Sequence, residues 1–388
     1  MASMKRNVWG LCGFALLCTV AQGSTAAITP SVASDNAHRS ALDLAVDAAA
    51  ADFFRNTCHV GLSLAVVNGD GNFYYDYGST VRGAARLPDK RSIYEIASVT
   101  KTFTGALAAD AIVDHRMALD RDFRTYLPEP YTNLTWGGKP ITLRTLVTHR
   151  SGMPRDIPDT DAIYAKKDFD TLPRELLALQ KGFDQNKLLS ALHTVNLRSE
   201  PGDKEAYSNA GFFVLGLGLE KMYGQPVEAL THQKILQPLG MTSTDFVVDS
   251  TNLPRLVHPY DRKGRLVPYH PRNAGVAWGL YSTTEDMAKY LRWQLDPRDP
   301  VIRVLHQPLV GTAQEGVAMA WNLAIEGHQP TLSHGGGSFG MSGEVQLYPE
   351  QQEGFALLAN DACEGTESAL KAIAVSIHAH AHPSKAVP

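Results

Sequence analysis

Residues 94–103 read YEIASVTKTF, and they mark the point where an extended run gives way to a helical one. Val99 and Phe103 recur at the spacing of one helix face, so we expect a helix to begin close to Ser98. Ser98 and Lys101 are three residues apart and share a face of that helix, where the amine can reach the hydroxyl. This junction predicts a strand that leads directly into a helix carrying a serine and a lysine.

The serine and lysine of this junction form a candidate nucleophile and activator. A serine hydroxyl is a poor nucleophile at neutral pH unless a neighbour takes its proton. The N-terminal end of a helix also favours the negative charge that develops during attack on a carbonyl. Taken alone, the pair is much more often a helix-capping serine followed by a solvated lysine.

Strand-like runs lie toward both ends of the chain, and helical runs broken by proline loops lie between them. The N-terminal part predicts a helix at 40–55 and strands at 61–67 and 73–77, joined by a turn at 68–71. The C-terminal part predicts strands at 319–325, 331–334, 344–348 and 354–359 and a last helix at 367–377.

This order predicts an α/β (α+β) fold. One antiparallel sheet of five or more strands is built from both termini, is flanked by the terminal helices and holds an inserted, mainly helical domain. We expect residues 27–95 and 276–388 to form a discontinuous sheet domain. Residues 96–275 would form the helical domain that carries Ser98.

The composition is that of an ordinary globular protein. The 388 residues are 44% hydrophobic and 20% charged, which excludes collagen-like, coiled-coil and disordered chains. The formal net charge is -4, so there is no basic surplus to neutralise phosphates, and we expect no nucleic-acid partner.

The first 26 residues have the organisation of a secretory signal peptide. Lys5 and Arg6 precede an apolar run at 8–21, and small residues follow at 23–27. We therefore expect export, most simply to the periplasm, and no stable membrane anchor after cleavage. An N-terminal anchor that is never cleaved is the alternative. Removal of the segment also removes two of the four cysteines, which leaves Cys58 and Cys363 and at most one disulfide.

Two further motifs carry candidate site residues. Tyr207-Ser208-Asn209 lies in a loop before a helical run, where a tyrosine near an ammonium can have its phenolate favoured and act as a base. Residues 334–337 read HGGG at the end of a strand-like run, where glycines allow a substrate backbone to approach closely. A capping loop and a glycine-rich turn are the ordinary alternatives.

In this order and spacing, the three motifs resemble those of penicillin-binding proteins and serine β-lactamases. The middle motif, Y-x-N, is similar to that of the class C β-lactamase and D,D-peptidase branch. Segments 142–154, 236–241 and 279–288 match it too, and the resemblance covers about residues 40–378. Residues 140–154 look most like the AmpH-type D-alanyl-D-alanine carboxypeptidase/endopeptidases.

The resemblance implies roles for individual residues and a β-lactamase/transpeptidase-like fold. Ser98 would be the acylated nucleophile and Lys101 its activator. Tyr207 would be the base that also serves the leaving group, and Asn209 would bind the substrate. No cofactor or metal would be needed.

His334 departs from the family pattern, while Gly336 and Gly337 agree with it. The β-lactamases of this branch usually have lysine where this chain has His334, so the resemblance to an efficient β-lactamase is weakened. A histidine there would carry a positive charge that depends on pH near neutrality. Gly336 and Gly337 would let the substrate approach, and the Gly337 N–H would donate to the oxyanion.

The expected function is that of an exported serine hydrolase that works through an acyl-enzyme. It would act as a D-alanyl-D-alanine carboxypeptidase/endopeptidase on peptidoglycan peptides and would bind β-lactams as inhibitors or slow substrates. A class C-type β-lactamase or an esterase on the same residues is the first alternative, and a non-catalytic peptidoglycan or penicillin sensor is the second. No anchor for a substrate carboxylate is assigned, because residues 319–325, expected beside His334, contain no Arg or Lys.

Three other signals compete with this interpretation. Residues 336–340 match G-x-S-x-G, which in an α/β-hydrolase requires a helix after Ser338. His378, His380 and His382 form a tail that resembles a metal clip. His149 is interpreted as a structural hydrogen-bonding residue.

The resemblance also implies a disulfide between Cys58 and Cys363. In the resembled fold the first and last strands of the sheet are antiparallel neighbours. Cys58 precedes the first of them and Cys363 follows the last, so the two Cα atoms could approach within the roughly 4.4–6.8 Å that a disulfide tolerates. Two independent thiols are the alternative.

Overall fold

The computed structural model describes residues 32–69, 71–271, 275–326 and 329–382. The expected signal peptide, with the cysteines at 12 and 18, lies outside the described residues. Within those ranges, no helix combines the length and the apolar character that a membrane crossing requires.

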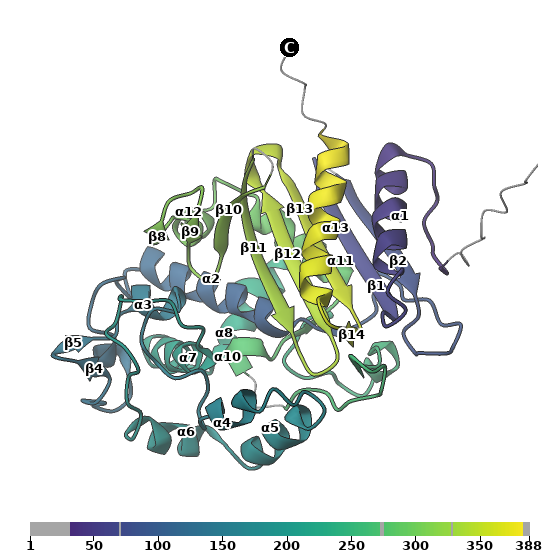
Figure 1. Ribbon diagram of the computed structural model, residues 1–388. Coiled ribbons are helices and arrows are strands. Elements are labelled where there is room, and N and C mark those ends of the chain that lie inside the picture. Colours follow the sequence, from purple (N-terminus) through teal and green to yellow (C-terminus); the bar gives the residue numbers. More distant parts are fainter. Residues whose placement is uncertain (1–31, 70, 272–274, 327–328, 383–388) are drawn as a thin grey trace, which may run out of the picture. The chain divides into compact units, whose positions relative to one another are not determined.

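One large antiparallel sheet organises the chain (Figure 1). Its eight described strands run in the order β2-β1-β13-β12-β11-β10-β9-β8. In sequence order they are β1 (Gly61–Asn68), β2 (Gly71–Gly78), β8 (Val310–Gly311), β9 (Gly316–Val317), β10 (Asn322–Glu326), β11 (Gln329–Gly337), β12 (Ser342–Tyr348) and β13 (Glu353–Ala359). The N-terminal hairpin thus joins the C-terminal strands, and the expected α/β fold is confirmed.

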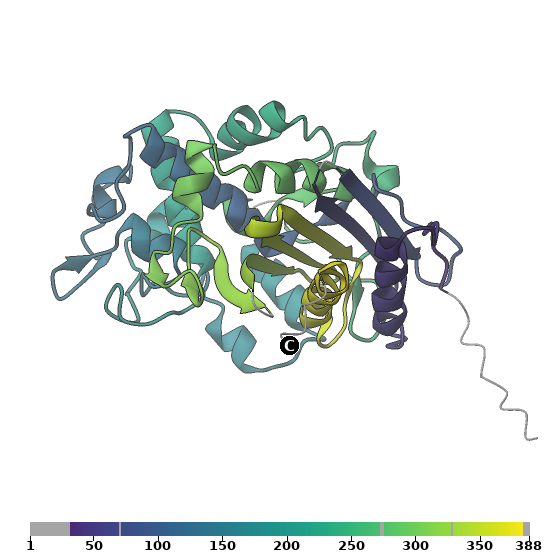
Figure 2. The same ribbon diagram turned by 90° about the horizontal axis from the view of Figure 1, so that it is seen from above.

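Both faces of the sheet are covered, which explains the almost continuous burial of β1. Successive side chains of a strand point to opposite faces. Leu62, Leu64 and Val66 accordingly pack with α1 (Ala41–Phe53) and α13 (Thr366–Ala381), whereas Ala65 and Val67 belong to the core on the other face. Figure 2 shows α1 and α13 together on one side of the strands.

The remaining helices and short strands lie mostly between β2 and β8. The helices are α2 (Thr100–Val113), α3 (Leu143–Val147), α4 (Asp161–Ala165), α5 (Leu172–Gln180), α6 (Gln185–Leu192), α7 (Asn209–Tyr223), α8 (Val227–Thr231), α9 (Gln237–Leu239), α10 (Gly275–Trp278), α11 (Thr284–Gln294) and α12 (Pro300–Leu305). The tighter or wider turns are η1 (Ala97–Val99), η2 (Phe123–Tyr126), η3 (His232–Leu236), η4 (Leu253–Arg255) and η6 (Pro349–Gln351). The two-residue strands are β3 (Tyr94–Glu95), β4 (Thr135–Trp136), β5 (Lys139–Pro140), β6 (Tyr260–Asp261), β7 (Tyr281–Ser282) and β14 (Asp361–Ala362).

The strand expected at 319–325 begins later than predicted. Met319, Ala320 and Trp321 are buried in the core, and Ala320 has a φ of 59°, which an extended strand does not permit. Strand β10 therefore starts at Asn322, and residues 319–321 are not among those that line the cavity at Ser98. The sequence pattern could not distinguish the buried turn at 319–321 from the strand that follows it, because buried turns and buried strands are equally apolar.

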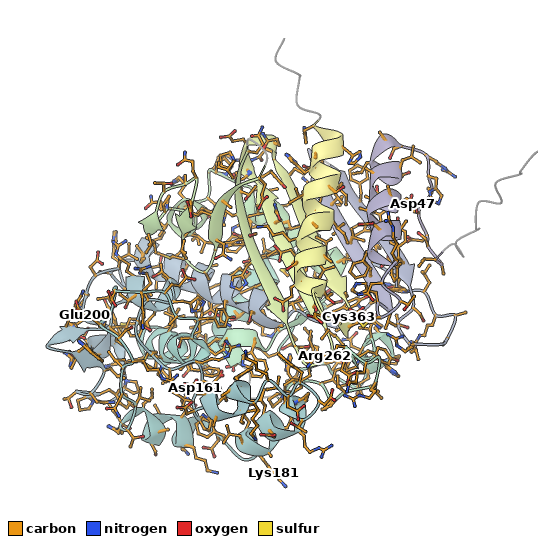
Figure 3. The ribbon with its side chains drawn as sticks, in the orientation of Figure 1. Asp47, Asp161, Lys181, Glu200, Arg262 and Cys363 are labelled. Atoms are coloured by element: carbon orange, nitrogen blue, oxygen red, sulfur yellow. A yellow bond between two sulfur atoms is a disulfide. The ribbon has the colours of Figure 1, made fainter. Side chains whose placement is uncertain are left out.

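A disulfide joins Cys58 to Cys363 in the structure, with the Cα atoms 6.1 Å apart. Cys58 precedes β1 and Cys363 follows β14, so the bond connects two segments separated by 305 positions in sequence. Figure 3 shows Cys363 at the lower end of α13. The bond therefore fixes the chain just before the first turn of that helix.

Candidate active site

Ser98 lies in the one-turn helix η1, between strand β3 and helix α2. The preceding residue, Ala97, has a φ of 46°, in the left-handed region that non-glycine residues rarely adopt. Such a conformation costs about 1–3 kcal/mol and persists only where surrounding contacts hold it. The expected strand-to-helix junction therefore also contains a strained residue next to the serine.

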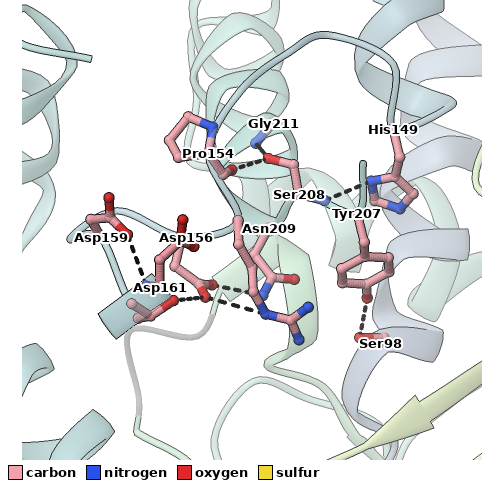
Figure 4. Close-up of polar contacts among 12 residues, drawn as sticks. Ser98, His149, Pro154, Asp156, Asp159, Asp161, Tyr207, Ser208, Asn209 and Gly211 are labelled. Atoms are coloured by element: carbon pink, nitrogen blue, oxygen red, sulfur yellow. Dashed lines mark hydrogen bonds and ion pairs between the residues drawn. The ribbon is translucent and has the colours of Figure 1, made fainter. Parts of the chain in front are cut away.

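The Ser98 hydroxyl contacts both of the side chains expected to act on it, and Figure 4 shows the contact with Tyr207. Tyr207 Oη donates a hydrogen bond to Ser98 Oγ at 2.5 Å, and Lys101 Nζ lies 3.2 Å from the same oxygen. Tyr207 comes from the loop before α7, more than 100 residues from Ser98 in sequence. The fold thus brings the first two motifs into direct contact.

Lys101 is fully buried, and its amine has three close oxygens. Besides Ser98 Oγ, Nζ contacts Asn209 Oδ1 at 2.7 Å and the Ala277 carbonyl at 2.6 Å. Burial lowers the pKa of Lys101 well below its ordinary value, and the Asp156 carboxylate offsets this only in part. In the neutral form, the two N–H groups can donate to the two carbonyl oxygens while the lone pair faces the Ser98 hydroxyl. The surroundings therefore favour an amine that accepts the Ser98 proton.

Tyr207 differs from the expectation that its phenolate is favoured. Partial burial raises the pKa of Tyr207 to about 12, and the hydrogen bond to Ser98 and the guanidinium of Arg155 lower it only in part. Lys101 cannot favour the phenolate because its own ammonium form is disfavoured. The phenol is therefore protonated near neutral pH and acts as a donor toward Ser98.

Asn209 begins helix α7 and orients the lysine. Its Nδ2 donates to Asp156 Oδ1 at 2.7 Å, which turns its Oδ1 toward Lys101. Thr160 Oγ1 donates to the other oxygen of Asp156 at 2.6 Å. The expected role of Asn209 as a substrate ligand is not visible here, because both ends of its amide already have protein partners. It acts in this arrangement as a positioning residue for Lys101.

His149 packs against the loop that carries Tyr207 and Ser208. Its Nδ1 accepts a hydrogen bond from the Ser208 N–H at 3.1 Å, and its ring lies 4.4 Å from the Tyr207 ring, centroid to centroid. Burial lowers the pKa of His149 well below its ordinary value, so the imidazole is neutral. This geometry agrees with the structural role inferred from the sequence.

The HGGG segment forms the end of β11 and has a free strand edge. Pairing between β10 and β11 ends at Asn322 and Ser333, whereas β12 continues beside β11 as far as Gly337. Among the described strands, none covers the other edge of residues 334–337. A Cβ at Gly336 would lie 2.5 Å from the Ile96 carbonyl oxygen and 3.0 Å from the Ser98 nitrogen. Only glycine allows β11 to approach the serine this closely.

His334 is buried and does not supply the charge expected of it. Its Nδ1 lies 2.7 Å from the Gly335 carbonyl oxygen. Burial and the nearby Lys101 lower the pKa of His334 to about 4, so its imidazole is neutral at pH 7. The sequence could not predict the lowered pKa of His334, because that pKa depends on how deeply the side chain is buried in the folded protein.

The competing G-x-S-x-G interpretation is wrong for this fold. Strand β12, not a helix, follows Ser338. Ser338 Oγ donates to the buried Glu95 Oε2 at 2.5 Å, and Glu95 Oε1 accepts from the His270 N–H at 2.7 Å. Ser338 therefore ties the loop after β11 to β3 and thereby holds the two sides of the Ser98 site together.

A cavity of about 470 Å³ opens at the serine. Its lining residues include Ser98, Tyr207, Asn209, Gly337, Arg155 and Glu367. A larger cavity, about 500 Å³, lies against α6 and α7 and contains none of the expected site residues. We therefore assign the site to the cavity at Ser98.

Sequence reasoning missed Arg155, Asp156 and Glu367. Arg155 is a partly exposed cation, with its Cζ 5.4 Å from the Tyr207 ring centre. A signal for the first two was present, because the adjacent charges lie between Pro154 and Pro158, where a rigid loop is expected. Glu367 carries no motif, and only the packing of α13 brings it to the cavity.

Two groups in the described chain could bring three metal-ligating atoms together. One contains His59, Asp361 and Cys363, but that cysteine is in the disulfide. The other contains Glu353 and, from the tail motif, His378 and His382. None of these residues lines the Ser98 cavity.

A serine at the junction of a strand and a helix, with a buried lysine and a tyrosine on its hydroxyl and a glycine strand edge beside it, defines a β-lactamase-fold serine hydrolase. The beta-lactamase family model matches residues 46–379, and the chain belongs to that family.

The curated relatives include a peptidase. The chain is 29% identical over 250 residues to the D-alanyl-D-alanine-carboxypeptidase/endopeptidase AmpH of Escherichia coli K12, and the match covers 64% of this chain and 61% of the relative. It is 26% identical over 279 residues to protein flp of Staphylococcus aureus N315, covering 69% of this chain and 52% of that protein. The chain thus spans about half to three fifths of the length of these relatives.

Solved structures share the fold. A class C beta-lactamase superposes with a TM-score of 0.74 at 18% identity and covers 87% of this chain and 96% of its own. A beta-lactamase/D-alanine carboxypeptidase from Pseudomonas syringae gives a TM-score of 0.73 at 22% identity, covering 89% of this chain and 100% of its own. These similarities establish the architecture and, with the family match, the place of the chain among β-lactamase-related serine hydrolases.

Proposed function

We propose that this protein is an exported D-alanyl-D-alanine carboxypeptidase/endopeptidase that acts on peptidoglycan peptides through an acyl-enzyme at Ser98. The observation that carries the proposal is the contact of Ser98 Oγ with Tyr207 Oη at 2.5 Å and with the buried amine of Lys101 at 3.2 Å. The similarity to AmpH and the neighbour described as a beta-lactamase/D-alanine carboxypeptidase support the substrate class.

In the proposed reaction, the neutral amine of Lys101 takes the Ser98 proton while Oγ attacks the scissile carbonyl carbon. The N–H groups of Ser98 and Gly337 hold the oxyanion, at the helix end and the strand edge. When the C–N bond breaks, Tyr207 gives its proton to the leaving amine, and the Lys101 ammonium restores that proton. Water then hydrolyses the ester by the same proton path, and Ser98 is regenerated.

The substrate backbone would lie along the free edge of β11, as in strand addition. Arg155 is the cation that lines the cavity and is our candidate for contact with a substrate carboxylate. His334, neutral at pH 7, would offer hydrogen bonds but no charge.

Export is part of the proposal and rests on the N-terminal sequence and on the disulfide, a bond typical of oxidising compartments. N-terminal sequencing of the protein recovered from its native host tests it. A chain that retains residues 1–26 in the cytoplasm would contradict export without affecting the enzymatic proposal.

The enzymatic proposal is tested by comparing four reactions of the purified protein. These are D-alanine release from a pentapeptide, cleavage of a cross-linked muropeptide, hydrolysis of a cephalosporin and hydrolysis of a p-nitrophenyl ester. We expect the two peptide reactions to be the fastest and fluorescent penicillin to label the protein. The Ser98→Ala variant should lose the peptide reactions and the labelling. Faster cephalosporin or ester turnover would favour the alternatives, and labelling without turnover would favour a sensor. Labelling that survives in Ser98→Ala would refute the nucleophile.

A further inference from the structure

Two carboxyl groups lie directly against the glycine segment of β11, on the face covered by α13. Glu344, on β12, is paired in register with Gly335, and Glu367 belongs to the first turn of α13. A Cβ at Gly335 would lie 3.0 Å from Glu344 Oε2 and 3.5 Å from Glu367 Oε2, so these oxygens are at most 3.0 + 3.5 = 6.5 Å apart. A Cβ at Gly337 would overlap Glu367 Oε1.

The more deeply buried of the two carboxyl groups, that of Glu344, has one oxygen without a hydrogen-bond partner among the described residues. Glu344 is 3% exposed, and its Oε1 is buried with no hydrogen-bond partner among the described residues. The cation that lowers the Glu344 pKa is Lys371, but its amine pairs with Glu326 Oε1 at 2.7 Å. Burial raises the pKa of Glu344 to about 8 and also raises that of Glu367. An unpaired buried carboxyl group is costly, and a cation placed beside it would remove that cost.

The other carboxyl group, that of Glu367, lines the same cavity as Ser98. Glu367 is exposed and lines the cavity at Ser98, and it also lines an adjoining cavity of about 340 Å³ at the start of α13. Arg155 is the one Lys or Arg among the described residues that line these two cavities. Glu367 is therefore an acidic group of the cavity wall, and a bound cation would stabilise its carboxylate form.

We propose that Glu367, backed by Glu344, is an ammonium-binding subsite of the Ser98 cleft. It selects substrates that carry a protonated primary amine close to the scissile carbonyl. The amine can belong to the acyl part or to the leaving group, since Glu367 and Ser98 line the same cavity. The ammonium would donate hydrogen bonds to the carboxylate of Glu367, and charge-assisted bonds of this kind are the stronger ones. This inference rests on the proposed acyl-enzyme and adds the substrate class.

The test compares matched acylating compounds that differ in one amine. One pair consists of two penicillins that are identical except for an α-amino group on the acyl side chain. The other consists of two esters that are identical except for an ammonium on the alcohol. The second-order rate constant of Ser98 acylation is measured by mass spectrometry for the wild type, Glu367→Gln and Glu367→Asp.

We expect the ammonium-bearing member to react about tenfold faster in one of the two pairs, as a charged hydrogen bond predicts. The pair that shows the preference identifies which part of the substrate carries the amine. The preference should fall to about onefold in Glu367→Gln and be partly retained in Glu367→Asp, which keeps the charge. Glu364→Gln removes an equal charge from an exposed position that lines neither cavity, and it should keep the preference.

Equal rates within both pairs in the wild type, or a preference that persists in Glu367→Gln, would overturn the subsite. A preference lost equally in Glu364→Gln would overturn it too, because the effect would then be one of general charge. Failure of the peptidase proposal is a separate result, since it appears as absent peptide cleavage while the two acylation ratios remain measurable. No acylation of Ser98 by any of the four compounds would overturn both.

Discussion

Replacement of Asp156 by asparagine should move the pH dependence of acylation to lower pH. The Asp156 carboxylate stabilises the ammonium form of Lys101 through Asn209, and Ser98 can be activated only by the neutral amine. Asparagine has nearly the same shape and can still accept from Asn209 Nδ2. The substitution therefore removes the charge and keeps the geometry. The pKa of Lys101 should fall, and the neutral amine should persist at lower pH.

The size of the shift follows from the path between the two charges. Asp156 Oδ1 is 2.7 Å from Asn209 Nδ2, and Asn209 Oδ1 is 2.7 Å from Lys101 Nζ. An amide group spans about 2.3 Å, so the charges are separated by at most about 7.7 Å. At an effective dielectric constant of about 20–40, this gives about 1–2 kcal/mol, or about 1 to 1.5 pH units.

The assay is the rate constant of Ser98 acylation by a fluorescent penicillin, measured from about pH 4 to 9 with melting temperatures recorded in parallel. The acid limb of the profile should shift down in Asp156→Asn. Asp159→Asn is the matched control, because Asp159 is exposed and pairs with Arg198 rather than with the site. An unshifted limb, or one that moves to higher pH, would refute the role given to the neutral lysine.

Four further results are expected. Tyr207→Phe should slow acylation of Ser98 by roughly 100-fold, through loss of a proton-transfer group, and an unchanged stopped-flow rate would contradict the role of the phenol. Gly336→Ala should abolish penicillin labelling, since its Cβ would lie 2.5 Å from a backbone oxygen, whereas Gly211→Ala, with 3.5 Å to its nearest neighbour, should label normally. His334→Gln should keep the shape of the pH profile of Ser98 acylation between pH 6 and 8, because burial lowers the pKa of His334 to about 4; an inflection near pH 7 that disappears in the variant would contradict this. Reduction of the disulfide, which closes a loop of 305 positions, should lower the melting temperature, with an upper limit of about 5–6 kcal/mol from chain entropy; calorimetry that shows no change would contradict a stabilising bond.

The sequence predicted the elements and the residues that recur in short motifs. Ser98 and Lys101 lie on one helical turn, so their contact follows from local geometry, and the strands near both ends predicted a shared sheet. Residues whose function depends on tertiary packing escaped prediction. Glu367 reaches the cavity only because α13 packs against β11 and β12, and Asp156 acts only through Asn209, which is 53 positions away.

The protonation states of the site residues were harder to predict from the sequence than the identity of those residues. The motifs suggested a favoured phenolate at Tyr207 and a titration of His334 near neutrality. Burial reverses both expectations, since it raises the pKa of Tyr207 and lowers that of His334, whereas the lowered pKa of Lys101 agrees with its expected role as the activator of Ser98. The depth of each side chain is a property of the whole fold, and no window of sequence around it carries that information.

The length of β10 decides whether the cleft exists. Its pairing with β11 stops at Asn322 because the chain turns inward at Ala320, and the next four residues of β11 keep an unpaired edge. A variant in which that buried turn were straightened would continue the hairpin over residues 334–337 and fill the groove with its own backbone. The enzyme would then be inhibited by its own strand. Insertions or deletions around 318–321 should for this reason be tolerated poorly in selection for activity, even where the protein still folds.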